Sequence, residues 1–418
     1  MNRPCDLAIV NCGELLTLAG ASDRPKRRSA LSDLDLIRNG AVGVSQGKIA
    51  WVGSQKEYRR LGRARREIDA EGRVVLPGFV DPHTHAVFAG SREGEWAQKM
   101  AGVPYLEILK KGGGILSTVE ATRKASLKSL YDAAEGYLRK MLSYGTTTVE
   151  IKSGYGLNLE NELKILKVIR KLKKSLPLDI VPTFMGAHAI PKEYLDRPEE
   201  YVDQVIQILP KVRSYAEFCD VFCEEGAFSA SQSRRILEAA RREGFRIKMH
   251  AGEFSDQGGV RLAAEFKALS VDHLDVIRME EMSLLAENGV IGVLLPGVSH
   301  FLKSGKHPPA RALIEAGVPI ALATDFNPGS SPCLSMQEMV HLAVRDLQFT
   351  PAEALSAATI NAAHAVGMAD RVGSLEVGKE ADLLILDLER YEQVPYFFGV
   401  NHVGKVLKKG RVVHSDGE

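Results

Sequence analysis

Strand-like and helix-like patterns of apolar and polar residues alternate through the middle of the chain, from about residue 74 to about residue 370. Short runs rich in β-branched and other apolar residues recur there, and each is followed by a stretch that is compatible with a helix. The runs are residues 74–83, 146–154, 178–188, 219–228, 245–253, 269–274, 290–297 and 318–327. This alternation is typical of parallel strands that are joined by crossover helices.

The segments between these runs support the same interpretation. Residues 160–176, 231–244 and 351–367 carry apolar side chains at helical spacing. Eight strands are the number that a closed barrel needs, and the region is long enough for a fold that typically takes about 250 residues. We therefore predict an α/β fold, a (β/α)8 TIM barrel over residues 74–370. A doubly wound open sheet is the alternative, and both folds place ligands at the carboxyl ends of the strands.

Both ends of the chain carry strand patterns. Residues 41–54 hold two β-rich runs around Gln46-Gly47, and residues 403–414 hold two around Lys409-Gly410, each a plausible hairpin. Residues 381–387 form another such run. Because isolated hairpins are only marginally stable, we expect one small β-sandwich-like domain built from residues 1–73 and 371–418, with the barrel inserted between them.

Composition narrows the class of partner. The 418 residues are 45% hydrophobic and 26% charged, which is typical of a globular protein, and the formal net charge is +1. We therefore expect no nucleic-acid partner. No apolar run approaches the ~20 residues that span a bilayer, so we expect no membrane partner. Five scattered cysteines indicate no disulfide framework and favour a cytoplasmic location, and we expect Cys219, Cys223 and Cys333 to be structural.

The candidate chemistry lies where the predicted strands end. His83 and His85 are one residue apart, so both imidazoles project from one face of an extended segment, with Cα atoms about 6.6 Å apart. His250, His273 and Asp325 close three other runs, and the strand ends of a barrel converge on one cavity. Three imidazoles and a carboxylate suit one zinc ion, with iron or manganese as alternatives. The competing interpretation treats each side chain as a separate core or rim residue.

These residues also carry a resemblance. Residues 75–90, 248–253, 270–274, 321–330 and 373–387 resemble the amidohydrolase superfamily of metal-dependent barrels. Residues 152–164, 185–188 and 325–332 more narrowly resemble those members that open the imidazolone ring in histidine degradation. The resemblance runs over nearly the whole chain. It implies hydrolysis of the cyclic amide C–N bond of 4-imidazolone-5-propanoate, a small-molecule substrate, to N-formimidoyl-L-glutamate by a metal-activated water.

The resemblance also implies residue roles. One ion, zinc or iron (Fe²⁺ or Fe³⁺), would be held by four ligands: His83, His85, His250 and Asp325. Substrate-binding positions would be Arg92, Tyr155, His188, Glu253, Asn327, Gly329 and Ser330, to which we add Tyr105 beside the glycine-rich stretch 110–117. Binuclear members carry a bridging carboxylated lysine on the fourth strand, and residues 219–228 have none, so a single-metal site follows. Superfamily members commonly form homodimers, although no segment marks an interface.

Physical chemistry assigns further roles to these groups. A bound divalent cation lowers the pKa of a coordinated water from about 15.7 to about 7. Asp325 and His273 would take and pass on a proton, and Glu253 would relay one to the leaving ring nitrogen. The sequence leaves open which of the three catalytic residues is the general base. Arg92 offers a bidentate fork for the propionate of the substrate. The residues from Asn327 to Ser330 also suit the simpler role of forming the turn after the last strand.

Two other functions fit parts of the sequence. A deaminase of a heterocyclic base would use a similar ligand set, and a metal-binding scaffold without activity would use the ligands alone. Glu253, His273 and Asp325 argue against the scaffold, since it needs no proton-transfer groups. The stretch 110–117 lacks the G-K-[ST] ending of a phosphate loop, so we expect a loop over the cavity and no nucleotide site.

Overall fold

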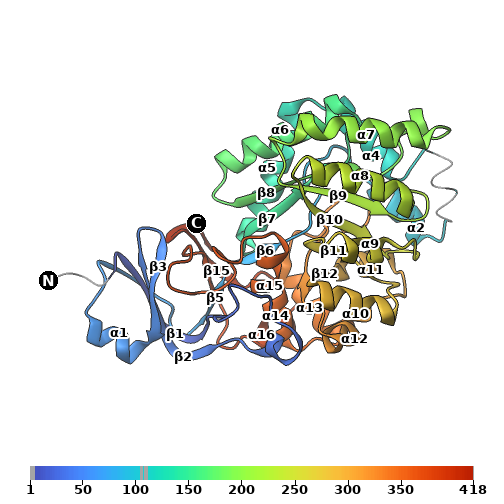
Figure 1. The fold of residues 1–418 in the computed structure, drawn as a ribbon. Helices are drawn as coiled ribbons and strands as arrows, with labels where there is room; N and C mark the ends of the chain where they lie inside the picture. The colour runs from blue at the N-terminus through green and yellow to red at the C-terminus, as the bar shows by residue number, and fades with distance from the viewer. Residues whose placement is uncertain (1–4, 104–106, 108–111, 418) are drawn as a thin grey trace.

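The computed structural model describes residues 5–103, 107 and 112–417. Two sheets organise the chain, as Figure 1 shows: a barrel wrapped by helices, and a smaller β unit in which the blue N-terminal and red C-terminal strands lie together. The predicted TIM barrel with a second sheet from both chain ends is thereby confirmed. Among the described residues, no helix is both long and apolar enough to cross a membrane.

Parallel strands in chain order build the barrel, and each of the eight predicted runs overlaps one of them. They are β6 (Phe79–Asp81), β7 (Thr146–Lys152), β8 (Asp179–Ala187), β9 (Phe218–Cys223), β10 (Arg246–Ala251), β11 (Ser270–His273), β12 (Ile291–Leu294) and β13 (Ile320–Leu322). A parallel bridge between Thr84 and Phe326 joins the first strand to the last. The sheet is therefore closed, which excludes the doubly wound alternative.

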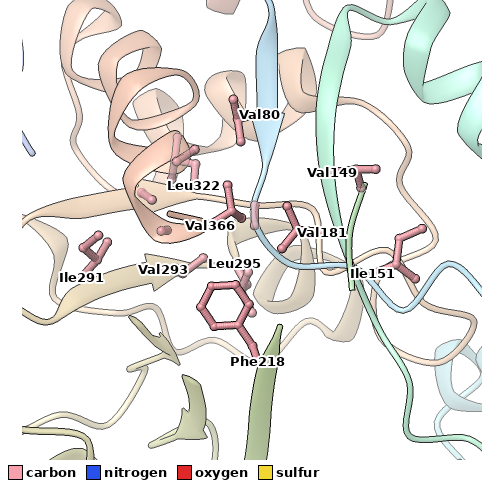
Figure 2. Close-up of a cluster of buried hydrophobic side chains, with 14 of the residues drawn as sticks. Val80, Val149, Ile151, Val181, Phe218, Ile291, Val293, Leu295, Leu322 and Val366 are labelled. Carbon is pink, nitrogen blue, oxygen red and sulfur yellow. The ribbon is translucent and has the colours of Figure 1, made fainter. Parts of the chain in front are cut away.

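Helices surround the barrel and link its strands. They are α2 (Glu93–Met100), α4 (Ile115–Lys124), α5 (Leu127–Ser143), α6 (Leu159–Ser175), α7 (Pro198–Val212), α8 (Ala230–Arg242), α9 (Gly259–Glu265), α10 (Met279–Asn288), α11 (Pro296–Leu302), α12 (Ala310–Ala316), α13 (Met336–Asp346), α14 (Pro351–Ala357) and α15 (Ile360–Ala365). Two 3₁₀ helices are also present: η1 (Arg28–Ser32) precedes the segment Leu36–Ser45, and η2 (Lys192–Tyr194) lies between β8 and α7. Figure 2 shows part of the buried apolar cluster, with side chains such as Val149 and Val293 from different barrel strands.

The second sheet is mixed and takes strands from both ends of the chain. Its strands are β1 (Leu7–Leu16), β2 (Leu36–Ser45), β3 (Lys48–Ser54), β4 (Arg66–Asp69), β5 (Val74–Pro77), β14 (Leu383–Leu386), β15 (Val403–Lys408) and β16 (Arg411–Ser415). Helix α1 (Gln55–Leu61) follows β3, and α16 (Gln393–Tyr396) precedes β15. Both predicted hairpins are confirmed, since β2 pairs with β3 and β15 pairs with β16.

The two units meet through the strand that precedes the barrel. Strand β5 pairs with β1 and with β14, so the first four residues of the run 74–83 belong to the terminal sheet, and the barrel begins at Phe79. Side chains of β5 alternate between two apolar clusters, with Leu76 in the cluster of the barrel and Val75 in that of the terminal sheet. The domain boundaries at residues 73/74 and 370/371 stay predictions.

Candidate functional site

The four predicted metal ligands lie together at the carboxyl ends of the barrel strands. His83 and His85 follow β6, His250 lies in β10, and Asp325 follows β13. Asp325 Oδ1 lies 3.3 Å from His83 Nε2 and 3.6 Å from His85 Nε2. The ring of His250 lies 4.4 Å from that of His83, measured between centroids. Because parallel strands end at one rim, side chains far apart in the sequence meet there.

Two buried carboxylates orient two of these imidazoles. His83 Nδ1 lies 2.6 Å from Asp272 Oδ2, and His250 Nδ1 lies 3.0 Å from Asp220 Oδ1. An ionised carboxylate only accepts hydrogen bonds, so each Nδ1 donates and each Nε2 keeps its lone pair. Neither Nε2 has a hydrogen-bond partner among the described residues, although both are buried. Unpaired buried nitrogens beside an acidic oxygen, with carboxylates behind the rings, fit a metal ion.

The imidazoles have the protonation state that a metal requires. Burial lowers the pKa of His83, His85 and His250 well below the usual value, and nearby cationic groups, Lys152 among them, lower it further. The rings are therefore neutral at physiological pH. Neutral imidazole is the form that ligates metal ions.

His273 and Glu253 lie beside the four ligands. His273 Nε2 is 3.6 Å from Glu253 Oε2, and the His273 ring lies 5.3 Å from the His250 ring. Burial raises the pKa of Glu253 well above its usual range, and the nearby Asp325 carboxyl raises it further. Burial also lowers the pKa of His273 to about 4. Burial therefore favours the protonated form of the Glu253 carboxyl and the neutral form of the His273 imidazole.

The donor atoms form two overlapping groups. Nitrogens of His83, His250 and His273 lie within 4.8 Å of one another, as do donor atoms of His83, His85 and Asp325. His83 is common to both. The backbone of His273 and of Asp325 lies in the left-handed region, with φ of +86° and +48°. Such conformations cost non-glycine residues about 1–3 kcal/mol and cluster at functional sites.

A cavity of about 430 Å³ opens above these residues and brings most of the predicted substrate positions together. The buried Tyr155 ring lies 5.7 Å from the His85 ring and 5.4 Å from that of His188. His188 stacks on His85 and its Nδ1 lies 3.1 Å from the carbonyl oxygen of Gly154. A Cβ atom at Gly154, whose φ is +115°, would lie 2.8 Å from His188 Nδ1. Gly154 thus allows His188 to reach its place against His85.

Cationic groups line one wall of the cavity. Arg92, directly before α2, donates from Nε to Glu95 Oε2 at 2.9 Å, and Lys99 lies in the same wall. The guanidinium of Arg92 packs against Gly329, where a Cβ atom would lie only 2.0 Å from Arg92 Nη1. This wall suits an anionic part of a ligand.

The turn after β13 shapes the edge of the site next to Arg92. Asn327 Oδ1 accepts hydrogen bonds from the backbone N–H groups of Gly329 and Ser330, both at 2.8 Å, and its Nδ2 donates to the carbonyl oxygen of Asp325 at 2.7 Å. These three residues line the cavity, and their contact with the substrate stays a prediction. The hydrogen bonds of Asn327 are, however, those of a turn-forming residue that holds Asp325 in place.

Sequence reasoning missed three carboxylates in the cavity wall, Glu95, Glu224 and Glu225. Glu224 accepts the N–H of Phe254 at 3.1 Å and so holds the loop after Glu253. Glu95 accepts from Arg92 and, at 3.1 Å, from the N–H of Gly114. The position of Glu224 directly after a strand, at the rim that carries the ligands, was a usable signal.

The remaining predictions concern Tyr105, the glycine-rich stretch and the cysteines. Tyr105 lies outside the described residues, as do residues 110 and 111 of the predicted loop. Cys219 and Cys223 are buried in the core as expected, and all five cysteines are free thiols. Cys333 is partly buried.

Comparison with known proteins places this geometry in context. A sequence profile of the amidohydrolase family matches residues 74–413. The chain is 49% identical over 417 residues to an imidazolonepropionase of Alkaliphilus oremlandii, covering 99% of each chain. It is 50% identical over 412 residues to one of Geobacillus kaustophilus, covering 97% of each. A solved adenosine deaminase of Xanthomonas campestris with bound zinc is similar in fold, with a TM-score of 0.72 at 22% identity over 99% of this chain and 93% of that one.

Proposed function

The chain belongs to the amidohydrolase family and, within it, to the imidazolonepropionases, and on this premise we propose how its strand-end residues carry out the hydrolysis. Imidazolonepropionases are hydrolases of histidine degradation. In the reaction, water adds to a ring carbon of 4-imidazolone-5-propanoate, the cyclic amide C–N bond breaks, and the ring nitrogen takes a proton to give N-formimidoyl-L-glutamate. The predicted enzyme class is confirmed, and a scaffold without activity is excluded.

The deaminase alternative has support only from the fold. The similar deaminase structures, such as that of Xanthomonas campestris, are 22% identical or less to this chain. The imidazolonepropionases are about half identical over the full length. Ring opening is therefore favoured over deamination.

One divalent ion, zinc or iron, would be held by His83, His85, His250 and Asp325. The observation that carries this assignment is the pair of buried Nε2 atoms of His83 and His250, unpartnered among the described residues, next to Asp325. When bound, the ion supplies a hydroxide nucleophile at neutral pH by lowering the pKa of water. Asp272 and Asp220 keep the two imidazoles in the tautomer that this requires.

Glu253 and His273, which lie beside these ligands, would carry out the proton transfers. Burial near Asp325 favours the protonated form of Glu253, so its carboxyl would be the donor for the leaving ring nitrogen. His273 Nε2 lies 3.6 Å from Glu253 Oε2, so it would take the proton that the attacking water loses and pass it to Glu253 after the latter has protonated the leaving nitrogen. Arg92, Lys99, Tyr155 and His188 line the cavity. In the proposed complex, the two cationic side chains would face the propionate and the two rings would flank the imidazolone.

Metal content and turnover test this function together. We expect elemental analysis of purified protein to find one zinc or iron ion per chain. We also expect the imidazolone absorbance to disappear when substrate is added, and a chelator to stop this loss. Full activity in protein from which the metal has been removed would contradict the assignment.

Arg92→Ala is expected to raise KM about 10–100-fold and to lower kcat much less. A hydrogen-bonded charge pair is worth about 1.5–3 kcal/mol, and a remote carboxylate contact binds substrate and transition state equally. Steady-state kinetics measure both constants.

Gly329→Ala should act in the same direction, because the new Cβ would displace the Arg92 guanidinium while the fold persists. Arg139→Ala, on the exposed face of α5, is the control. An unchanged KM in Arg92→Ala would remove this residue from the site.

The cellular location and the oligomeric state of the enzyme stay predictions. The free cysteines agree with a cytoplasmic location, and the homodimer expected from the superfamily can be measured by light scattering.

A further inference from the structure

A cluster of charged side chains lies in the barrel interior beneath the candidate metal ligands. It consists of Glu150 and Lys152 from β7, Asp220 from β9, Lys248 from β10 and Asp272 from β11, and all five side chains are fully buried. Burying a charge is costly unless it is paired, so a cluster of this size needs an explanation. The mechanism above uses only the two aspartates.

Lys152 connects those two aspartates. Its Nζ atom lies 2.7 Å from Asp220 Oδ2 and 3.3 Å from Asp272 Oδ2. The same two carboxylates accept from Nδ1 of His250 and of His83. The ammonium group of Lys152 is therefore connected to each of two candidate ligands, His250 and His83, through one aspartate.

Lys248 provides a natural comparison within the same cluster. Its Nζ atom lies 2.6 Å from Glu150 Oε2 and donates to the carbonyl oxygens of Pro82 and Ala365. Lys152 also pairs with Glu150, at 3.0 Å. Within the part of the chain that the structure describes, Lys248 makes no ion pair with Asp220 or Asp272. The two lysines thus share burial and one partner. Among the contacts of the described residues, Lys152 pairs with the aspartates, whereas Lys248 binds the two backbone carbonyl oxygens.

We propose that Lys152 is a positioning residue of the metal centre, whose ammonium group holds Asp220 and Asp272 so that they fix the His250 and His83 rings. Two carboxylates near each other in a medium of low dielectric constant repel one another strongly. The ammonium between them offsets this repulsion and draws one oxygen of each toward itself. The carboxylates are then held where the Nδ1 atoms of both imidazoles meet them. The inference rests on the metal site of the proposed function.

Zinc affinity without substrate tests this proposal. Competition with a chromogenic chelator would measure the dissociation constant for zinc in the wild-type enzyme, Lys152→Met and Lys248→Met. Loss of a group that supports metal ligands typically weakens metal binding about 10–100-fold, and we expect a change of that size for Lys152→Met. For Lys248→Met we expect a change of less than about threefold, because the aspartates keep their ammonium partner. The visible spectrum of the cobalt-substituted enzyme should change only in Lys152→Met.

Thermal unfolding monitored by circular dichroism separates positioning from stability. Both methionine variants lose a buried charge, so both should unfold at lower temperature. If Lys152→Met does not fold, Glu150→Gln/Lys152→Met keeps the charge of the cluster constant and should still bind zinc weakly, while Glu150→Gln alone should bind normally. Equal zinc affinity in the wild type and in Lys152→Met, or equal losses of zinc affinity in both lysine variants, would overturn this inference. The proposed metal site would remain. A wild-type enzyme that binds no zinc or iron would overturn the proposed metal site as well.

Discussion

His250→Ala is expected to lose both bound metal and turnover. The substitution removes the Nε2 donor and leaves the buried Asp220 carboxylate without its imidazole partner. A metal ion that activates water contributes several kcal/mol to the reaction, so kcat/KM should fall on the order of 10³-fold or more. Elemental analysis and loss of imidazolone absorbance measure the two effects in the same preparation.

A second histidine serves as the control for this variant. His341 lies in α13, outside the cavity, and its Nδ1 lies 2.8 Å from the carbonyl oxygen of Pro395. His341→Ala should keep both metal and activity. If His250→Ala kept its full metal content, the ligand set would have to be reassigned, and His273 would be the first candidate because it lies with His83 in a second donor group.

Glu253→Gln is expected to keep its metal and to lower kcat by about 10²–10⁴-fold, the contribution of a positioned general acid. Glutamine has a similar shape but no carboxyl proton, so the leaving ring nitrogen loses its donor. Because burial raises the pKa of Glu253, the wild-type donor persists to a higher pH than an ordinary glutamic acid would, and it is lost as the pH rises through that raised value. The pH dependence of kcat should therefore lose its alkaline limb in the variant.

A neighbouring glutamate provides the matched control. Glu225 also lines the cavity but is exposed, and Glu225→Gln should change kcat little. An unaltered kcat in Glu253→Gln would exclude Glu253 as the acid. Loss of metal in that variant would instead show that Glu253 holds the ion.

The barrel was predictable because its signal is local. Strand-sized apolar runs alternate with helical ones, and residues such as His83 and Asp325 stand directly after them, so a rule about strand ends sufficed to group the ligands. One helical pattern was modified by packing. Residues 351–367 split into α14 and α15, and between them the carbonyl oxygen of Ala358 accepts the N–H of Val80 in β6. Pairing with a strand here interrupts the helix.

The sequence by itself determined the order of strands and helices and the polar side chains that end each strand, because these depend on periodicity within short segments. Only the tertiary structure decided which interior charges meet. Asp272 and His83 are 189 positions apart, and Lys152 and Asp220 are 68 apart. Their contact depends on the stagger of neighbouring strands and on closure of the sheet, and no local pattern records either of these.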